Sequence, residues 1–97
     1  MIKSFGSKTA EHIFDGINSK ESRKLHSDLH PKAARLLDQL NAMTEIETLY
    51  VPPSNNLEKL SGNYKGYWSI RINLKWRVIF KWERSHVWDV DIVDYHH

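Results

Sequence analysis

Apolar and polar residues alternate along the second half of the chain, and this alternation predicts an antiparallel sheet. From Leu57 onward the pattern has a period of two, which is typical of strands that bury one face. We expect three strands joined by short turns. The residues expected on their shared apolar face are Trp68, Ile70 and Ile72, then Trp76, Val78, Phe80 and Trp82, and finally Trp88, Val90 and Ile92.

The first half of the chain opens with a predicted strand and a predicted helix. Residues 2–5 are expected to form a short strand. Ser7 is suited to cap a helix over residues 8–14, and Gly16 is suited to end it. The polar, aperiodic residues 18–24 are expected to form a loop.

A second helix is expected to begin at Pro31, which suits the first helical position. Its apolar residues recur at steps of three and four and share one face: Ala33, Leu36, Leu37, Leu40 and Met43. Thr44 and Glu47 have the spacing of a capping box for one more short turn, and Pro52 and Pro53 then end the helical region.

These elements predict an α+β fold, in which N-terminal helices pack on one face of a small, mostly antiparallel sheet. A chain of 97 residues has the length of a single domain, so we expect residues 1–97 to form one. The chain has no cysteine and no run of apolar residues long enough to cross a membrane. Its N-terminus is too polar for a signal peptide, and a cytoplasmic protein without membrane contact is therefore expected.

The alternation also restricts the pairing of the strands, because a slip of one residue would turn an apolar face outward. A loop at residues 73–75 pairs Ile70 with Val78 and places Arg71 opposite Arg77. A loop at residues 84–86 gives three further pairs: Phe80 with Val90, Trp82 with Trp88, and Lys81 with Asp89.

Two arginines that face each other across a sheet repel, which suggests that an anion fits between Arg71 and Arg77. Planar guanidinium groups are suited to hold a phosphate. In the alternative interpretation, Asp91 neutralises Arg77 diagonally and the pair has no function. Tyr95 is an even number of residues from both arginines, so the alternating pattern places it on the same surface.

The segment from Lys59 to Arg84 has seven basic residues and one acidic residue, a net charge of +6. Such a stripe is typical of phosphate contact, although a solvated sheet face gives the same pattern. Besides the arginine pair, the candidates for RNA contact in this segment are Lys59, Lys65, Lys75, Lys81 and Arg84. The C-terminal residues Asp91, Asp94, His96 and His97 match no metal-binding spacing, so neither a metal site nor a cofactor is expected.

The chain resembles the HigB-type toxins, also called plasmid-maintenance killer proteins, of the RelE/ParE superfamily of toxin–antitoxin systems. The resemblance covers nearly the whole chain and is strongest in GYWSIRIN (66–73), WRVIFKW (76–82) and DVDIVDYH (89–96). It implies a small sheet with helices on one side and cleavage of mRNA on the translating ribosome. It also implies a helix-turn-helix antitoxin of the HigA type, through which alone the toxin would meet operator DNA.

The resemblance further implies roles for the C-terminal residues. RNA can be cut without a metal when its 2′-hydroxyl attacks the adjacent phosphate, and this reaction needs a base, an acid and cations. His96 would transfer protons, Asp94 would act as a base or orient the imidazole, and Tyr95 would stack on a base or donate its hydroxyl. Arg71 and Arg77 would hold the phosphate.

One position departs from a branch of that family. The branch has a histidine in the loop before the sheet, where this chain has Glu58, so Glu58 or Lys59 would substitute as an acid or base. Two alternatives to an endoribonuclease stay open: a ParE-like toxin that disables DNA gyrase by binding, and a more general nucleic-acid-binding sheet.

Overall fold

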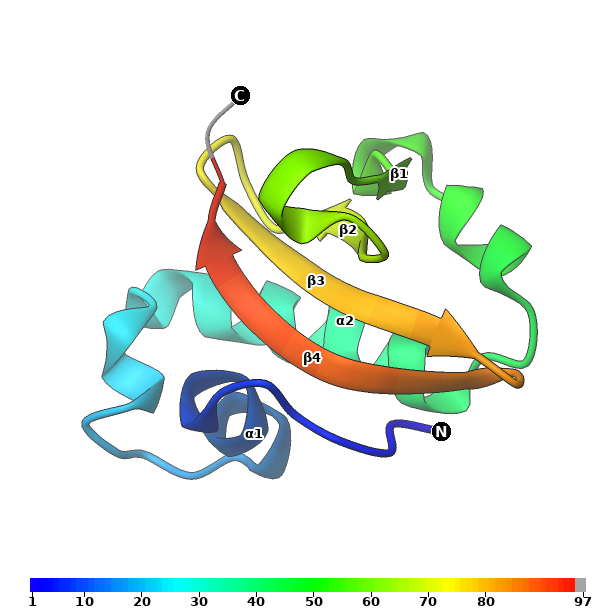
Figure 1. Ribbon diagram of the computed structural model, residues 1–97. Coiled ribbons are helices and arrows are strands. Elements are labelled where there is room, and N and C mark those ends of the chain that lie inside the picture. Colours follow the sequence, from blue (N-terminus) through cyan, green and yellow to red (C-terminus); the bar gives the residue numbers. More distant parts are fainter. Residues whose placement is uncertain (96–97) are drawn as a thin grey trace.

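The computed structural model describes residues 1–95, and the predicted catalytic His96 lies outside these described residues. Figure 1 shows a curved antiparallel sheet with the strand order β1-β2-β3-β4 and helix α2 crossing behind it. Helix α1 lies beside the start of α2, below the sheet in this view. The α+β fold predicted from the sequence is confirmed.

Both α-helices form where the sequence predicts them. In α1, Lys8–Asp15, the Ser7 hydroxyl accepts a hydrogen bond from the Ala10 amide at 3.3 Å, and Gly16 ends the helix at a φ of 72°. Helix α2, His30–Ala42, has Pro31 in its first turn. The α2 residues predicted to face the core are all buried: Ala33, Leu36, Leu37 and Leu40. Figure 1 shows why, since α2 lies against the rear face of the sheet.

Five short 3₁₀ turns connect the described elements, and two of them correct the sequence prediction. Their bounds are η1 Ser22–Lys24, η2 Ser27–Leu29, η3 Ile46–Tyr50, η4 Pro53–Asn55 and η5 Gly62–Tyr64. Turn η1 lies where a loop was expected. The capping box of Thr44 and Glu47 is wrong, because η3 begins after Glu45 and has no side-chain cap.

The sheet consists of β1 (Glu58–Lys59), β2 (Trp68–Arg71), β3 (Trp76–Glu83) and β4 (His86–Asp94). In the first long hairpin, the pairings of Ile70 with Val78 and of Arg71 with Arg77 are confirmed. The apolar side chains between the sheet and α2 form the core, and the largest of them, Phe80, is completely buried. The side chains of the opposite parity are therefore on the open face of the sheet.

The predicted pairing in the second hairpin is wrong near its turn. Arg84 and Ser85 form a two-residue turn with φ values of 53° and 62°, rather than a three-residue loop. This turn pairs Lys81 with Trp88, and Val87 takes the buried position expected for Trp88. A β-bulge between Ile79 and Lys81 restores the predicted register beyond it.

The extra residue of the bulge is on β4, where Asp89 has a φ of 53°. Lys81 and Asp89 therefore do not pair directly, yet their side chains still form an ion pair, with a Nζ to Oδ2 distance of 3.5 Å. At the far end of the ribbon, Val78 pairs with Ile92. The bulge thus keeps one apolar face continuous although the turn is one residue shorter than predicted.

The N-terminal segment lies along the outer edge of β4, as Figure 1 shows. It runs parallel to β4 through single bridges, Ile2 to Val87 and Phe5 to Val90. The Lys3 amide donates to the Val87 carbonyl at 2.7 Å, and the Gly6 amide donates to the Val90 carbonyl at the same distance. The expected opening strand is thus a bridged edge segment, which covers the exposed edge of β4. No helix among residues 1–95 is long and apolar enough to cross a membrane.

Candidate active site

The open face of the sheet holds a buried arginine near the turn between β2 and β3. Arg77 projects from β3 and is 5% exposed. Its Nη1 donates to the Ser69 hydroxyl at 3.0 Å and to the Asn56 carbonyl at 3.5 Å, and its Nη2 lies 3.9 Å from Oε1 of Glu58. A charge this deeply buried needs such partners, because removing it from water is costly.

Arg71 lies directly across from Arg77 and is held much less tightly. Its side chain is half-buried, and its Nε is buried without a hydrogen-bond partner among the described residues. A buried donor without an acceptor is uncommon in folded proteins and costs free energy. The pair thus combines one fixed guanidinium group with one whose Nε donor has no partner within residues 1–95.

The alternative role of Asp91 is wrong as it was stated. Asp91 pairs with Ile79 on β3, and its Oδ1 accepts a hydrogen bond from the Ile92 amide at 2.7 Å. Within residues 1–95, the ion pair of Arg77 is with Glu58. The counter-ion comes from β1, an element that the alternating pattern did not predict.

Tyrosine rings surround the Arg77 side of this face. The Tyr95 ring centre lies 6.0 Å from Cζ of Arg77, so the expectation from parity is confirmed. Tyr64 packs edge-on against Tyr95 at 5.8 Å and against Tyr67 at 6.1 Å between ring centres. Lys81 lies over the Tyr67 ring at 5.1 Å. The sequence analysis did not predict Tyr64 and Tyr67 as site residues. The sequence feature that pointed to them was their position near glycines in the basic segment.

Asp94 and Tyr95 are brought to the turn between β2 and β3. Asp94 pairs with Trp76, and its Oδ2 lies 3.7 Å from Nζ of Lys75. The Tyr95 amide donates to the Lys75 carbonyl at 3.2 Å. These contacts direct the end of the described chain toward the arginine pair. The predicted role of His96 falls on a residue outside the described range.

The other predicted RNA contacts are distributed unevenly. Lys59 and Lys75 lie over the rings of Trp68 and Trp76, at 5.5 and 5.7 Å, and Lys65 is exposed. Arg84 is in the distant turn of the second hairpin, seven residues along β3 from Arg77, which is roughly 23 Å at the rise of a strand. The structure therefore does not bring Arg84 to the site.

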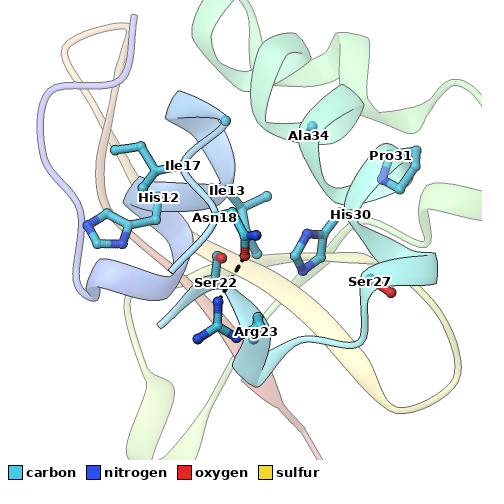
Figure 2. Close-up of a pocket in the computed structure, with 11 residues that line it drawn as sticks. His12, Ile13, Ile17, Asn18, Ser22, Arg23, Ser27, His30, Pro31 and Ala34 are labelled. Atoms are coloured by element: carbon cyan, nitrogen blue, oxygen red, sulfur yellow. Dashed lines mark hydrogen bonds between the residues drawn. The ribbon is translucent and has the colours of Figure 1, made fainter. Parts of the chain in front are cut away.

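A cavity of about 620 Å³ lies elsewhere, between the end of α1 and the start of α2. Figure 2 shows His12 and His30 in its wall and the hydrogen bond from Arg23 to Asn18, which measures 3.0 Å. His12 bonds to the Ser19 hydroxyl at 2.7 Å, and His30 bonds to the Leu25 carbonyl at 2.8 Å. Both histidines are half-buried and have hydrogen-bond partners.

Within residues 1–95, no group of three histidine, aspartate or glutamate side chains could hold a metal ion. The cavity behind the sheet contains none of the predicted site residues. The chemistry available on the described surface is therefore that of the open face: two arginines, a glutamate, tyrosine hydroxyl groups and lysines.

The fold is that of the RelE-like toxins. The chain is similar to a chain of the YoeB–YefM complex from Staphylococcus aureus, with a TM-score of 0.59, 21% identity and coverage of 100% of this chain and 99% of that one. It is also similar to YafQ from Escherichia coli, with a TM-score of 0.58, 18% identity and coverage of 97% and 91%. At these identities the likeness shows the fold.

The sequence defines the family within that class. The profile described as RelE-like toxin of type II toxin-antitoxin system HigB matches residues 3–96. Toxin HigB-1 of Vibrio cholerae is 35% identical over 82 residues, which are 84% of each chain. Endoribonuclease HigB of Proteus vulgaris is 31% identical over 100 residues, covering 99% of this chain and 100% of that protein. This chain belongs to the HigB-like toxin family, as the sequence resemblance indicated.

Proposed function

We propose that this protein is the toxin of a type II toxin–antitoxin pair and an endoribonuclease that cuts mRNA on the translating ribosome. The observation that carries the proposal is the arginine pair, in which Arg71, whose buried Nε has no hydrogen-bond partner among residues 1–95, lies across the strands from the fixed Arg77. An anion between them would accept from Arg71 and offset the repulsion of the pair. The phosphate of RNA is that anion, and a HigB relative carries the name endoribonuclease.

The proposed reaction uses the 2′-hydroxyl of the RNA as its nucleophile. The 2′-oxygen bonds to phosphorus while the bond from phosphorus to the 5′-oxygen breaks, which leaves a 2′,3′-cyclic phosphate and a 5′-hydroxyl. A base takes the proton of the 2′-hydroxyl, and an acid gives a proton to the leaving 5′-oxygen. No metal takes part in these steps, because the arginines stabilise the negative charge that develops on the phosphate.

The residues at the end of β4 are proposed to move these protons. His96 is the residue proposed for proton transfer, because imidazole is the side chain whose unperturbed pKa lies nearest to neutral pH. Asp94 orients the imidazole or acts as the base. The Tyr95 ring, beside Arg77, is placed to stack on a nucleobase or to donate its hydroxyl.

The remaining basic residues near the site are proposed to bind the RNA backbone. Lys81 borders the tyrosine cluster, and Lys59, Lys65 and Lys75 extend the positive surface around β1, β2 and their turns. A helix-turn-helix antitoxin of the HigA type is the proposed partner and carries the contact with operator DNA. An action on ribosomes places the protein in the cytoplasm.

Cleavage of a defined mRNA on purified ribosomes tests this function. Ribosomes with a codon in the A site should yield one cut in that codon, with a 2′,3′-cyclic phosphate on the upstream fragment. A deoxy substitution that removes the 2′-hydroxyl at the cut should abolish the product. Cleavage of the deoxy substrate would contradict the mechanism. If the mRNA stays intact while the same protein blocks supercoiling by DNA gyrase, the ParE-like alternative is correct.

A further inference from the structure

We infer that Ser69, Glu58 and Asn56 are positioning residues that fix the guanidinium group of Arg77 for the scissile phosphate. This inference rests on the proposed function and assigns Glu58 a role other than proton transfer. From the sequence, Glu58 was a substitute acid or base. In the structure it is the counter-ion of an arginine that is 5% exposed.

Ser69 provides the first of the contacts that hold Arg77. It is completely buried, and its hydroxyl accepts from Nη1 of Arg77 at 3.0 Å across the β2–β3 pair. It pairs with Ile79 across the strands and lies two residues before Arg71 on the same face of β2. A buried hydroxyl group at this place is explained by the donor that it satisfies.

Glu58 and Asn56 provide the second contact. The Oε1 atom of Glu58 lies 3.9 Å from Nη2 of Arg77 and accepts a hydrogen bond from Nδ2 of Asn56 at 3.0 Å. Asn56 has a φ of 49°, a left-handed conformation that asparagine tolerates better than most residues. That conformation directs the Asn56 carbonyl toward Nη1 of Arg77, at 3.5 Å.

Together these contacts leave specific donors of Arg77 for a substrate. An arginine has five N–H groups. The two on Nη1 have Ser69 and Asn56 as acceptors, and one on Nη2 faces Glu58. The Nε donor and the second Nη2 donor are not used by these partners. Because both terminal nitrogens are held, the guanidinium plane is fixed before the phosphate arrives, and preorganised donors of this kind stabilise a transition state most effectively.

Three substitutions separate positioning from proton transfer. Ser69→Ala removes one acceptor and no titratable group. Glu58→Gln removes the charge but keeps an oxygen for Asn56. Asn56→Gly removes the side-chain amide, and glycine accepts the positive φ. Single-turnover cleavage on ribosomes should be measured against pH and toxin concentration, with Ser27→Ala, which removes an exposed hydroxyl behind the sheet, as the control.

We expect Ser69→Ala and Glu58→Gln each to lower the maximal cleavage rate by about 10- to 100-fold, with less than a threefold change in the half-saturating toxin concentration. The shape of the pH–rate profile should not change. In the Arg77→Gln background, Ser69→Ala should have no further effect, because it acts through Arg77. A purely structural role would lower the fraction of folded protein instead, which the urea midpoint of each variant reports.

Failure of the proposed function and failure of the positioning inference would give different experimental results. If the unaltered protein cleaves no mRNA, the proposed function fails and the inference fails with it. If the unaltered protein cleaves and Glu58→Gln loses one limb of the pH–rate profile, Glu58 transfers a proton and the inference is wrong. Unchanged maximal rates in both Ser69→Ala and Glu58→Gln would also overturn it. Should Ser69→Ala fail to fold, Glu58→Gln decides the matter.

Discussion

At the residue scale, the two facing arginines differ in a way that the sequence could not reveal. Parity alone places Arg71 opposite Arg77, and the structure confirms this pairing. The alternation treats the two residues as equal, and on that basis replacing either one would relieve repulsion without loss of stability. The structure makes them unequal, because Glu58 and Ser69 hold Arg77 while Nε of Arg71 has no partner among the described residues.

This difference predicts opposite effects on stability. Arg71→Gln should leave the free energy of unfolding unchanged or raise it by up to ~1 kcal/mol, because it relieves cross-strand repulsion. Arg77→Gln should lower it by about 1–3 kcal/mol, because it leaves Ser69 and Glu58 without their buried partner. Urea midpoints of the two variants measure both effects. Equal midpoints for the two variants, or a midpoint of Arg71→Gln below that of the unaltered protein, would contradict this account of the pair.

Some of the other site residues could be predicted from the sequence, and some could not. Asp94 and Tyr95 follow from the strand pattern, since they continue β4 past its apolar residues. Tyr64, Tyr67 and Asn56 are in irregular segments, where no period assigns a side chain to a face. Ser69 has the correct parity in the pattern, but its function depends on a buried arginine whose depth only the folded sheet determines.

At the element scale, the two α-helices and the strands β2, β3 and β4 were predicted well, whereas β1 and the turn of the second hairpin were not. A strict alternation fixes which residues share a face, but it does not report an extra residue in one strand. The bulge at Asp89 and the two-residue turn at Arg84 and Ser85 shift the register in opposite senses. The predicted pairing of Val78 with Ile92 therefore holds, while Trp82 pairs with Val87.

The turn itself gives a prediction about stability. Ser85 has a φ of 62°, a conformation that costs an L-residue roughly 1–2 kcal/mol and costs glycine nothing. Ser85→Gly should therefore raise the free energy of unfolding by about 0.5–1 kcal/mol, after the greater chain entropy of glycine in the unfolded state is subtracted. Ser27→Gly, in a 3₁₀ turn, is the matched control and should lower stability. A lower urea midpoint for Ser85→Gly would show that this φ is not strained.

His86, at the start of β4, should make the free energy of unfolding depend on pH. Burial lowers the pKa of His86 below its usual 6.5, and Lys3 and the Met1 amino group lower it further. The unfolded chain therefore binds a proton at His86 more readily than the folded chain does, so stability should fall as the pH falls from about 7.5 through 6.5. His86→Gln should flatten this part of the curve in urea titrations at several pH values. An unchanged slope would contradict the role of His86.

At the scale of the whole molecule, one face of the sheet packs on a helix and the other face holds the arginine pair. Helix α2 covers the rear of the sheet, and the N-terminal segment covers the edge of β4, as Figure 1 shows. The arginine pair and the tyrosine cluster occupy the open face. Arg84 belongs to the same basic segment of the sequence but is at the distant turn.

The salt dependence of RNA affinity should distinguish basic residues near the site from Arg84 in the distant turn. If single-stranded RNA binds across the open face, Lys81→Gln should reduce the slope of log affinity against log salt concentration by about 0.7, the value for one phosphate contact on a single strand. Arg84→Gln removes the same charge at the turn and should leave the slope unchanged. Fluorescence titrations of a short RNA over a range of salt concentrations measure both. Equal effects of the two variants would mean that the whole basic segment acts as one diffuse surface.

The most direct test of the central claim is a map of mRNA 5′ ends after induction of the protein in cells. The unaltered protein should create new 5′-hydroxyl ends within translated codons. Arg71→Gln, which is expected to fold normally, should reduce them by about 10²–10³-fold at equal protein level. His96→Gln should reduce them by about 10²–10⁴-fold as the loss of a proton-transfer group. Growth arrest with no new 5′ ends, or with the same ends from Arg71→Gln, would contradict the claim that the arginine pair forms the phosphate site of an endoribonuclease.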